Sequence, residues 1–164
     1  MLKDNIQFSD KMKIAIVSGK DEGPTKLNAF DNALSKAGIG DVNLIKVSSM
    51  LAGNAKIQIL PKLKAGAMVN CVLSEVTSDN PGDVITASVS LAIGEELGCV
   101  VEASGINKDV DEVIRESKEM VEYMMEKRGV EIKKLYTEVS TTTVEKIASA
   151  VAAVVYLNDE IQVK

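Results

Sequence analysis

Two neighbouring segments of strand length constrain the fold of this chain more than any other feature. Residues 67–78 read AMVNCVLSEVTS, residues 84–93 read VITASVSLAI, and the turn sequence DNPGD lies between them. Apolar and β-branched residues dominate both segments, whereas Asp, Asn, Pro and Gly are typical of turns. The pattern predicts two long strands joined by a turn, so the chain is expected to be built around β-sheet.

Shorter strands are expected on both sides of this pair. Apolar or alternating runs of strand length occur at residues 13–18, 42–47, 55–60, 98–104 and 131–140. The segment GKDEGPT that follows the first of these runs is expected to form a turn. Residues 1–12 are polar and lack periodicity, so we expect them to form a loose arm.

Two helices are expected between the strands. The first has apolar residues at helical spacing, with Thr25 as its N-terminal cap and Gly38 as its left-handed C-terminal residue. The second is longer and amphipathic, begins at the capping pair Asp109 and Glu112, and ends at Gly129. With the strands, these helices predict a single α+β domain over residues 1–164.

The last apolar segment, VEKIASAVAAVVYL at residues 144–157, is ambiguous by its own pattern. Its alanines favour a helix, whereas a continuous apolar run also fits a strand that is buried on both faces.

The composition excludes several classes of chemistry. The chain contains no histidine, which removes Ser-His-Asp and Cys-His nucleophile systems and histidine-ligated zinc. Cys71 and Cys99 lie in apolar runs without a CxxC partner, so we expect buried free thiols in a reducing, cytoplasmic compartment. A formal net charge of −5 argues against nucleic acid or an anionic membrane as partner, and no apolar run reaches membrane-spanning length.

Few segments could carry catalysis. The GKDEGP turn could bind an anion at the start of the first helix, but a plain connecting loop is favoured several-fold, because the glycine spacing of phosphate loops is absent. Glu102 follows the apolar run GCVV, where burial would raise its pKa and make it a proton donor near neutral pH. A solvated carboxylate at the end of a strand is the alternative.

The segment LNAFDNALSKAGIGDVNLIKVSSM at residues 27–50 resembles the proenzyme segment of pyruvoyl-dependent arginine decarboxylases. The resemblance continues through LPKLKAGAMV (60–69), PGDVITASVSLAI (81–93), the VVEASG glutamate, the KRG helix end (127–129) and the TVEKIASAVAAVVYL tail. It covers residues 13–157 at matching spacing.

This resemblance implies self-cleavage between Ser48 and Ser49 into a β chain, 1–48, and an α chain, 49–164. The Ser49 hydroxyl would attack the Ser48 carbonyl, and elimination and hydrolysis would leave a pyruvoyl group in place of Ser49. That covalent group would act as the electrophile for amino-acid decarboxylation, without pyridoxal phosphate and without a metal.

The resemblance also implies roles for three further residues. Asn43 would support self-cleavage, and Glu102 would return a proton to the α-carbon after CO2 leaves. Asp31 would bind the guanidinium of arginine through paired, charge-assisted hydrogen bonds. Without the resemblance, Asp31 would be read as a charge on a helix surface. The implied reaction converts L-arginine to agmatine and CO2 for polyamine synthesis.

The fold implied by the resemblance is an αββα sandwich of two mainly antiparallel sheets with flanking helices. It makes residues 144–157 a strand, against their helix propensity. The implied assembly is a homotrimer of αβ units with active sites between neighbouring subunits, and pairing of trimers into hexamers stays open.

The chain departs from the better-known members of this family at three places. It has Leu51-Ala52 in place of Pro-Pro, Ala103 in place of Tyr, and Thr142-Thr143 in place of His-Thr. These positions concern pocket walls and packing between subunits, so two alternatives stay open. One is a pyruvoyl-dependent decarboxylase of another amino acid, and the other is a trimeric binding or scaffold protein that does not process itself.

Overall fold

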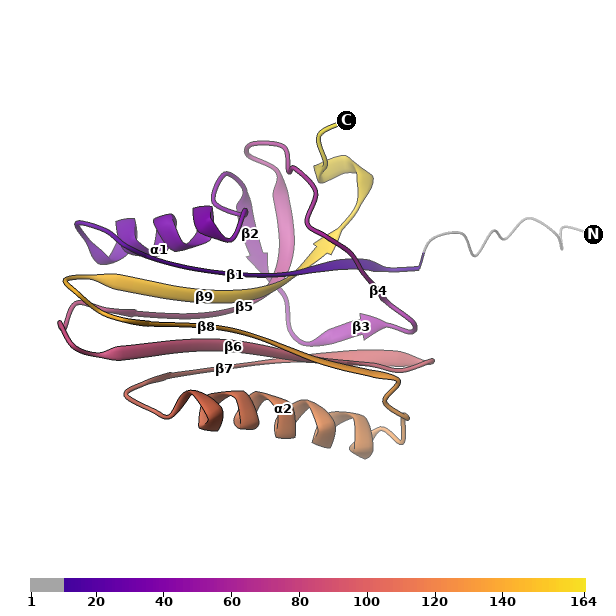
Figure 1. Ribbon diagram of the computed structural model, residues 1–164. Helices are drawn as coiled ribbons and strands as arrows, with labels where there is room; N and C mark the ends of the chain where they lie inside the picture. Colours follow the sequence, from indigo (N-terminus) through magenta and orange to yellow (C-terminus); the bar gives the residue numbers. More distant parts are fainter. Residues whose placement is uncertain (1–10) are drawn as a thin grey trace, which may run out of the picture.

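The computed structural model describes residues 11–164, so most of the loose arm predicted for residues 1–12 lies outside the described residues (Figure 1). In chain order the elements are β1 (Lys13–Glu22), α1 (Lys26–Lys36), β2 (Asn43–Lys46), β3 (Met50–Ala52), β4 (Lys56–Ile57), β5 (Met68–Ser78), β6 (Val84–Ile93), β7 (Leu97–Ile106), α2 (Val110–Lys127), β8 (Lys134–Thr143), β9 (Ala148–Leu157) and the 3₁₀ helix η1 (Asp159–Ile161).

The strands form two sheets. One has five strands in the order β2-β5-β9-β1-β4, and the other has four in the order β3-β7-β6-β8. All pairs in the four-stranded sheet are antiparallel, as are β1–β9 and β5–β9, whereas the outer pairs β1–β4 and β2–β5 are parallel. This confirms the predicted α+β class with two mostly antiparallel sheets.

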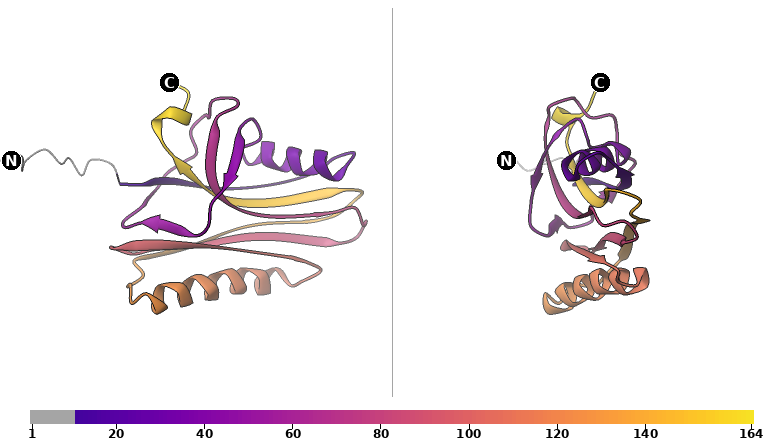
Figure 2. Two further views of the ribbon diagram at one scale, coloured as in Figure 1. Left: turned by 180° about the vertical axis from the view of Figure 1, so that it is seen from behind. Right: turned by 90° about the vertical axis from the view of Figure 1, so that its left-hand side faces the viewer.

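The two sheets face each other, and one helix covers the outer face of each (Figure 1; Figure 2, right). Apolar side chains from both sheets form a buried cluster between them, including Ile14, Val72 and Val154 from one sheet and Val89 and Val100 from the other. The buried residues of α1 are Ala29, Ala33 and Leu34, and those of α2 are Val113, Ser117, Val121 and Met125.

Strand β6 matches the predicted boundaries, and nearly all of its residues are buried. It is buried on both sides because α2 covers one face and the five-stranded sheet covers the other. Its small polar side chains are paired across the helix contact: the Ser117 hydroxyl lies 3.0 Å from that of Ser88 and 2.8 Å from that of Ser90. Burial of these hydroxyls is therefore compatible with a stable fold.

The predicted helix ends are confirmed by their geometry. The Asn28 backbone N–H donates to the Thr25 hydroxyl at 3.1 Å, and Gly38 has a φ of +84° after α1. The Asp111 N–H donates to the Asp109 carboxylate at 3.0 Å, and Gly129 has a φ of +67° after α2.

The ambiguous tail forms strand β9, as the resemblance implied. It lies between β1 and β5, with a register that runs from Lys13↔Leu157 to Glu22↔Ala148 on the β1 side. Eight of its ten residues are buried. Burial between two sheets and pairing on both edges therefore override the helix propensity of its alanines.

The predicted and observed strand boundaries differ most at three segments. Strand β1 continues to Glu22, where a turn was predicted, because the segment pairs with β9 along its whole length. The Glu22 carboxylate also accepts hydrogen bonds from the N–H groups of Lys146 at 2.7 Å and Ile147 at 3.2 Å. The run at 55–60 pairs as a strand only at Lys56–Ile57, and β8 begins at Lys134, not at residue 131.

Candidate active site

The serine pair lies in the short connection between β2 and β3, where the chain crosses from the five-stranded to the four-stranded sheet. On the first side, the Val47 N–H donates to the Cys71 carbonyl at 2.9 Å. On the second side, the Val100 N–H donates to the Ser49 carbonyl at 2.8 Å. The Ser48–Ser49 peptide therefore lies between two fixed points, one on each sheet.

The self-cleavage expected from the resemblance would involve the Ser49 hydroxyl and the Ser48 carbonyl. Within residues 11–164, the hydroxyls of Ser48 and Ser49 have no hydrogen-bond partner, and neither does the Ser48 carbonyl. A hydroxyl next to an unpaired carbonyl, in irregular backbone with fixed ends, fits the conversion of Ser49 into a pyruvoyl group. The Ser48 carbonyl carbon can therefore become tetrahedral without loss of a hydrogen bond between strands.

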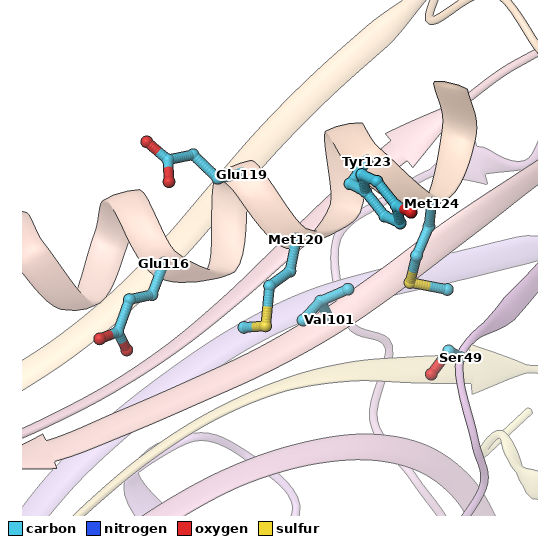
Figure 3. Close-up of a pocket in the computed structure, with 7 residues that line it drawn as sticks. All are labelled: Ser49, Val101, Glu116, Glu119, Met120, Tyr123 and Met124. Atoms are coloured by element: carbon cyan, nitrogen blue, oxygen red, sulfur yellow. The ribbon is translucent and has the colours of Figure 1, made fainter. Parts of the chain in front are cut away.

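Two cavities open on the serine pair. The smaller, about 190 Å³, is lined by Val47, Ser48, Ser49, Met50, Asn70 and Tyr156. The larger is a groove of about 590 Å³ between β7 and α2, lined by Ser49, Val101, Glu116, Glu119, Met120, Tyr123 and Met124. Figure 3 shows Met120 and Met124 projecting from α2 toward the side on which Val101 and Ser49 lie. Ser49 is common to both cavities and is thus reachable from two sides.

Glu102 lies on β7, two residues after the Val100 amide that holds Ser49, and falls inside the strand that was predicted over residues 98–104. Burial raises the pKa of its carboxyl, the charge of Lys46 lowers that pKa in part, and Glu75 raises it further. The direction is the one predicted, although the side chain keeps access to solvent in the single chain. The site therefore contains a carboxyl group that holds its proton more readily than an ordinary glutamate.

The two cysteines are free and buried, as predicted. Burial raises the pKa of the Cys71 thiol to about 11, with a small opposing effect of Lys46, so this thiol stays protonated at neutral pH. The Cys99 thiol contacts the Met50 sulfur at 4.0 Å on β3. Both cysteines thus pack beside the serine connection as apolar residues.

Asn43 lies at the start of β2, at the end away from the serine pair. Its side-chain amide donates to the Gly66 carbonyl at 3.1 Å, and Asn43 lies opposite Met68 in the register of β2 with β5. A single chain therefore does not bring the Asn43 amide to the Ser48 carbonyl, and its role in self-cleavage stays a prediction.

Asn70 is the amide that lines the small cavity with both serines, and the sequence reasoning missed it. A signal was present, because Asn70 is the one strongly polar residue in the otherwise apolar run AMVNCVL.

Asp31 is exposed on α1 and has no ion-pair partner among residues 11–164. Helix α1 covers the outer face of the five-stranded sheet, whereas the serine connection leaves that sheet toward the four-stranded sheet (Figure 1). One chain thus brings Ser48, Ser49 and Glu102 into one region and leaves Asp31 and Asn43 outside it.

Two further features of the described residues bear on the predicted chemistry and environment. In residues 11–164, no group of three or more Cys, Asp or Glu side chains is arranged to hold a metal ion. No helix in the same part of the chain is both long and apolar enough to span a membrane.

Known proteins resemble the chain over nearly its whole length. The family model described as pyruvoyl-dependent arginine decarboxylase matches residues 13–161. A pyruvoyl-dependent arginine decarboxylase of Methanothermobacter thermautotrophicus is 57% identical over 147 residues, which cover 90% of this chain and 97% of the relative. Enzymes of the same name are 40% identical in Methanocaldococcus jannaschii (85% of this chain, 86% of the relative) and 39% identical in Thermococcus sibiricus (93% and 99%). The chain belongs to the family of pyruvoyl-dependent arginine decarboxylases.

Proposed function

We propose that this protein decarboxylates L-arginine to agmatine and CO2, with a pyruvoyl group that it makes from its own Ser49. The observation that carries the proposal is the Ser48–Ser49 peptide, held at both ends and free at its reacting atoms, in a chain of this family. Glu102 supports it, because a carboxyl with a raised pKa lies two residues from the amide that holds Ser49.

Self-cleavage begins with attack of the Ser49 hydroxyl oxygen on the Ser48 carbonyl carbon. The peptide C–N bond breaks, the nitrogen of residue 49 takes up a proton, and an ester replaces the amide. Elimination then breaks the Cβ–O bond, releases residues 1–48 as a carboxylate and leaves a dehydroalanine at position 49. One water molecule enters and ammonia leaves, and the α chain 49–164 begins with pyruvoyl.

The bound pyruvoyl group supplies an electrophilic carbonyl that takes the substrate's α-amine and accepts the electrons released with CO2. The residues of this chain supply the rest. The Val100 N–H fixes the carbonyl of residue 49 at 2.8 Å, and Met120 and Met124 line an apolar groove beside it. Glu102, whose pKa is raised by desolvation, donates a proton to the α-carbon.

The second half of the site comes from a neighbouring subunit in this proposal. Three apolar side chains are exposed near Asp31 and Asn43: Leu27 on α1 at 74%, Ile45 on β2 at 40% and Met68 on β5 at 61%. Exposed apolar residues around isolated polar ones are typical of an interface. We infer a homotrimer of αββα sandwiches in which Ser49 and Glu102 of one subunit meet Asp31 and Asn43 of the next.

Asp31 would then bind the guanidinium of arginine by two parallel hydrogen bonds, which an ammonium cannot make. A second candidate substrate is another amino acid, favoured by one observation: Ala103, next to Glu102, stands where better-known members have a larger tyrosine. The buried free thiols Cys71 and Cys99 support a reducing, cytoplasmic location.

The test combines intact mass spectrometry with substrate comparison. We expect two chains that meet at residues 48 and 49, with the larger one blocked by pyruvoyl, and particles of trimer mass by light scattering. Decarboxylation assayed in parallel with arginine, lysine and ornithine should favour arginine by a wide margin. An uncleaved wild-type protein would overturn the enzyme proposal, and equal rates for lysine and arginine would overturn the substrate alone.

A further inference from the structure

The segment that carries the serine pair is fixed directly after the scissile bond by a residue of the C-terminal strand. The Tyr156 hydroxyl on β9 donates a hydrogen bond to the Met50 carbonyl at 2.8 Å. The preceding carbonyl, that of Ser49, accepts the Val100 N–H at 2.8 Å. Two consecutive carbonyl groups are therefore held from two sides, one by the four-stranded sheet and one by the five-stranded sheet.

The position of Tyr156 is well defined by its surroundings. Its side chain is partly buried and packs against the apolar cluster between the two sheets. Burial raises the pKa of its hydroxyl, so the group remains a hydrogen-bond donor throughout the neutral range. The same side chain lines the cavity of about 190 Å³ that both serines share. Tyr156 therefore connects the rigid core of the molecule to the backbone at the cleavage point.

We propose that Tyr156 is a positioning residue that keeps residue 49 in place during and after self-cleavage. The inference rests on the proposed function. Cleavage turns residue 49 from an interior residue into a chain end, and chain ends fray unless the fold ties them down. Val100 binds the Ser49 carbonyl through its backbone amide, which nearly any residue could supply. Tyr156 binds the Met50 carbonyl through its side chain. Of these two hydrogen bonds, which together we call the clamp, only the one from Tyr156 can be removed by substitution.

The Tyr156→Phe variant tests this role, because it removes one hydroxyl and keeps the ring. A neutral hydrogen bond contributes about 0.5–1.5 kcal/mol, which corresponds to a change of roughly twofold to tenfold. We expect the half-time of self-cleavage to lengthen by that factor, as measured by intact mass. In the processed enzyme, kcat should fall similarly while KM stays the same. Tyr136→Phe is the matched control, because the Tyr136 hydroxyl on β8 has no hydrogen-bond partner in residues 11–164.

A second measurement is independent of catalysis. Amide hydrogen exchange at residues 50–52 is compared between Ser49→Ala and the double variant Ser49→Ala/Tyr156→Phe, neither of which can process. Faster exchange in the double variant supports the clamp. If exchange, cleavage and kcat are all unchanged and only the melting temperature falls, Tyr156 is merely structural and the inference is wrong. Failure of the wild-type protein to cleave would instead overturn the proposed function, and the exchange comparison would still decide the clamp.

Discussion

The Ser74 hydroxyl on β5 donates a hydrogen bond of 2.7 Å to the Ala103 carbonyl on β7, directly beside Glu102. This contact joins the two sheets through a buried side chain. It fixes the part of β7 that carries the proposed proton donor relative to the strand that carries Glu75. The position of Glu102 and its distance from Glu75 therefore depend on this hydrogen bond between the two sheets.

The Ser74→Ala variant should lower the free energy of unfolding by about 1 kcal/mol, because it removes the only donor of this inter-sheet bond from a buried position. For a protein of this size, that corresponds to a fall of roughly 2–4 °C in melting temperature. Thermal unfolding at constant protein concentration measures the effect. Ser104→Ala, at an exposed serine of β7, the strand whose carbonyl accepts this bond, should leave the melting temperature unchanged. Equal falls in melting temperature for both substitutions would show that the bond between Ser74 and Ala103 does not stabilise the fold.

The pH dependence of decarboxylation should move in opposite directions when the two charges near Glu102 are removed. Lys46 lowers the pKa of Glu102 and Glu75 raises it. Because the protonated carboxyl is the active form in the proposed mechanism, activity should fall as pH rises through that pKa. Lys46→Met should shift the alkaline limb of the kcat profile to higher pH, and Glu75→Gln should shift it to lower pH. These two residues also pair with each other at 3.7 Å, so a shared loss of structure would move both profiles alike and contradict the prediction.

Replacement of Ser49 by alanine should leave a folded, full-length chain without decarboxylase activity. The attacking hydroxyl is lost, and so is the carbon skeleton from which the pyruvoyl group forms. Ser49→Cys should cleave slowly, because a thiol can make the same acyl shift. Intact mass spectrometry over time follows both variants. Cleavage after residue 48 in the Ser49→Ala protein would refute self-cleavage by this hydroxyl.

Glu102→Gln should be processed normally but decarboxylate arginine roughly 10²–10⁴-fold more slowly, the usual contribution of a general acid. The amide keeps the shape of the side chain and has no proton of suitable acidity to give. Steady-state kinetics on fully processed protein measure the change, and Glu126→Gln, an exposed glutamate of α2, serves as the control. Unchanged turnover would show Glu102 to be an ordinary surface carboxylate.

Asp31→Asn should weaken arginine use while self-cleavage continues, because the acyl shift involves no substrate. Removal of one partner of a desolvated charge pair costs about 2–5 kcal/mol, so kcat/KM for arginine should fall by roughly 30-fold to several thousand-fold. Asp41→Asn, another exposed aspartate close in sequence, should behave as wild type. Unchanged arginine kinetics in Asp31→Asn would refute the arginine contact and leave the pyruvoyl chemistry intact.

Local signals predicted the elements whose ends are set by local chemistry. Residues 84–93 form β6 as predicted, since turn residues bound an apolar run, and Thr25 and Gly38 bound α1 through caps that act within a few residues. Strand β1 was predicted too short, because its last four residues are held by β9, which lies more than 120 residues later. Long-range pairing of this kind leaves no mark on the segment itself.

The candidate site shows the same division. Glu102 could be singled out because the apolar run before it indicated burial; desolvation does raise its pKa, although the side chain is exposed in the single chain. Asn70 and Tyr156 escaped notice, since their cavity exists only where β5, β9 and the serine connection meet. For Asp31, nothing within one chain supplies a partner among residues 11–164, and its proposed role depends on a second subunit.

The order of the strands also sets when the proposed self-cleavage can occur in the life of the protein. Strand β9 lies between β1 and β5, so the five-stranded sheet lacks its middle strand until residues 148–157 have left the ribosome. Tyr156, which holds the Met50 carbonyl, emerges at the same late moment. The backbone around the serine pair thus reaches its folded form only after residues 148–157 have been made. Because the proposed self-cleavage divides a single polypeptide, the cell would obtain the two chains in equal numbers without having to balance their translation.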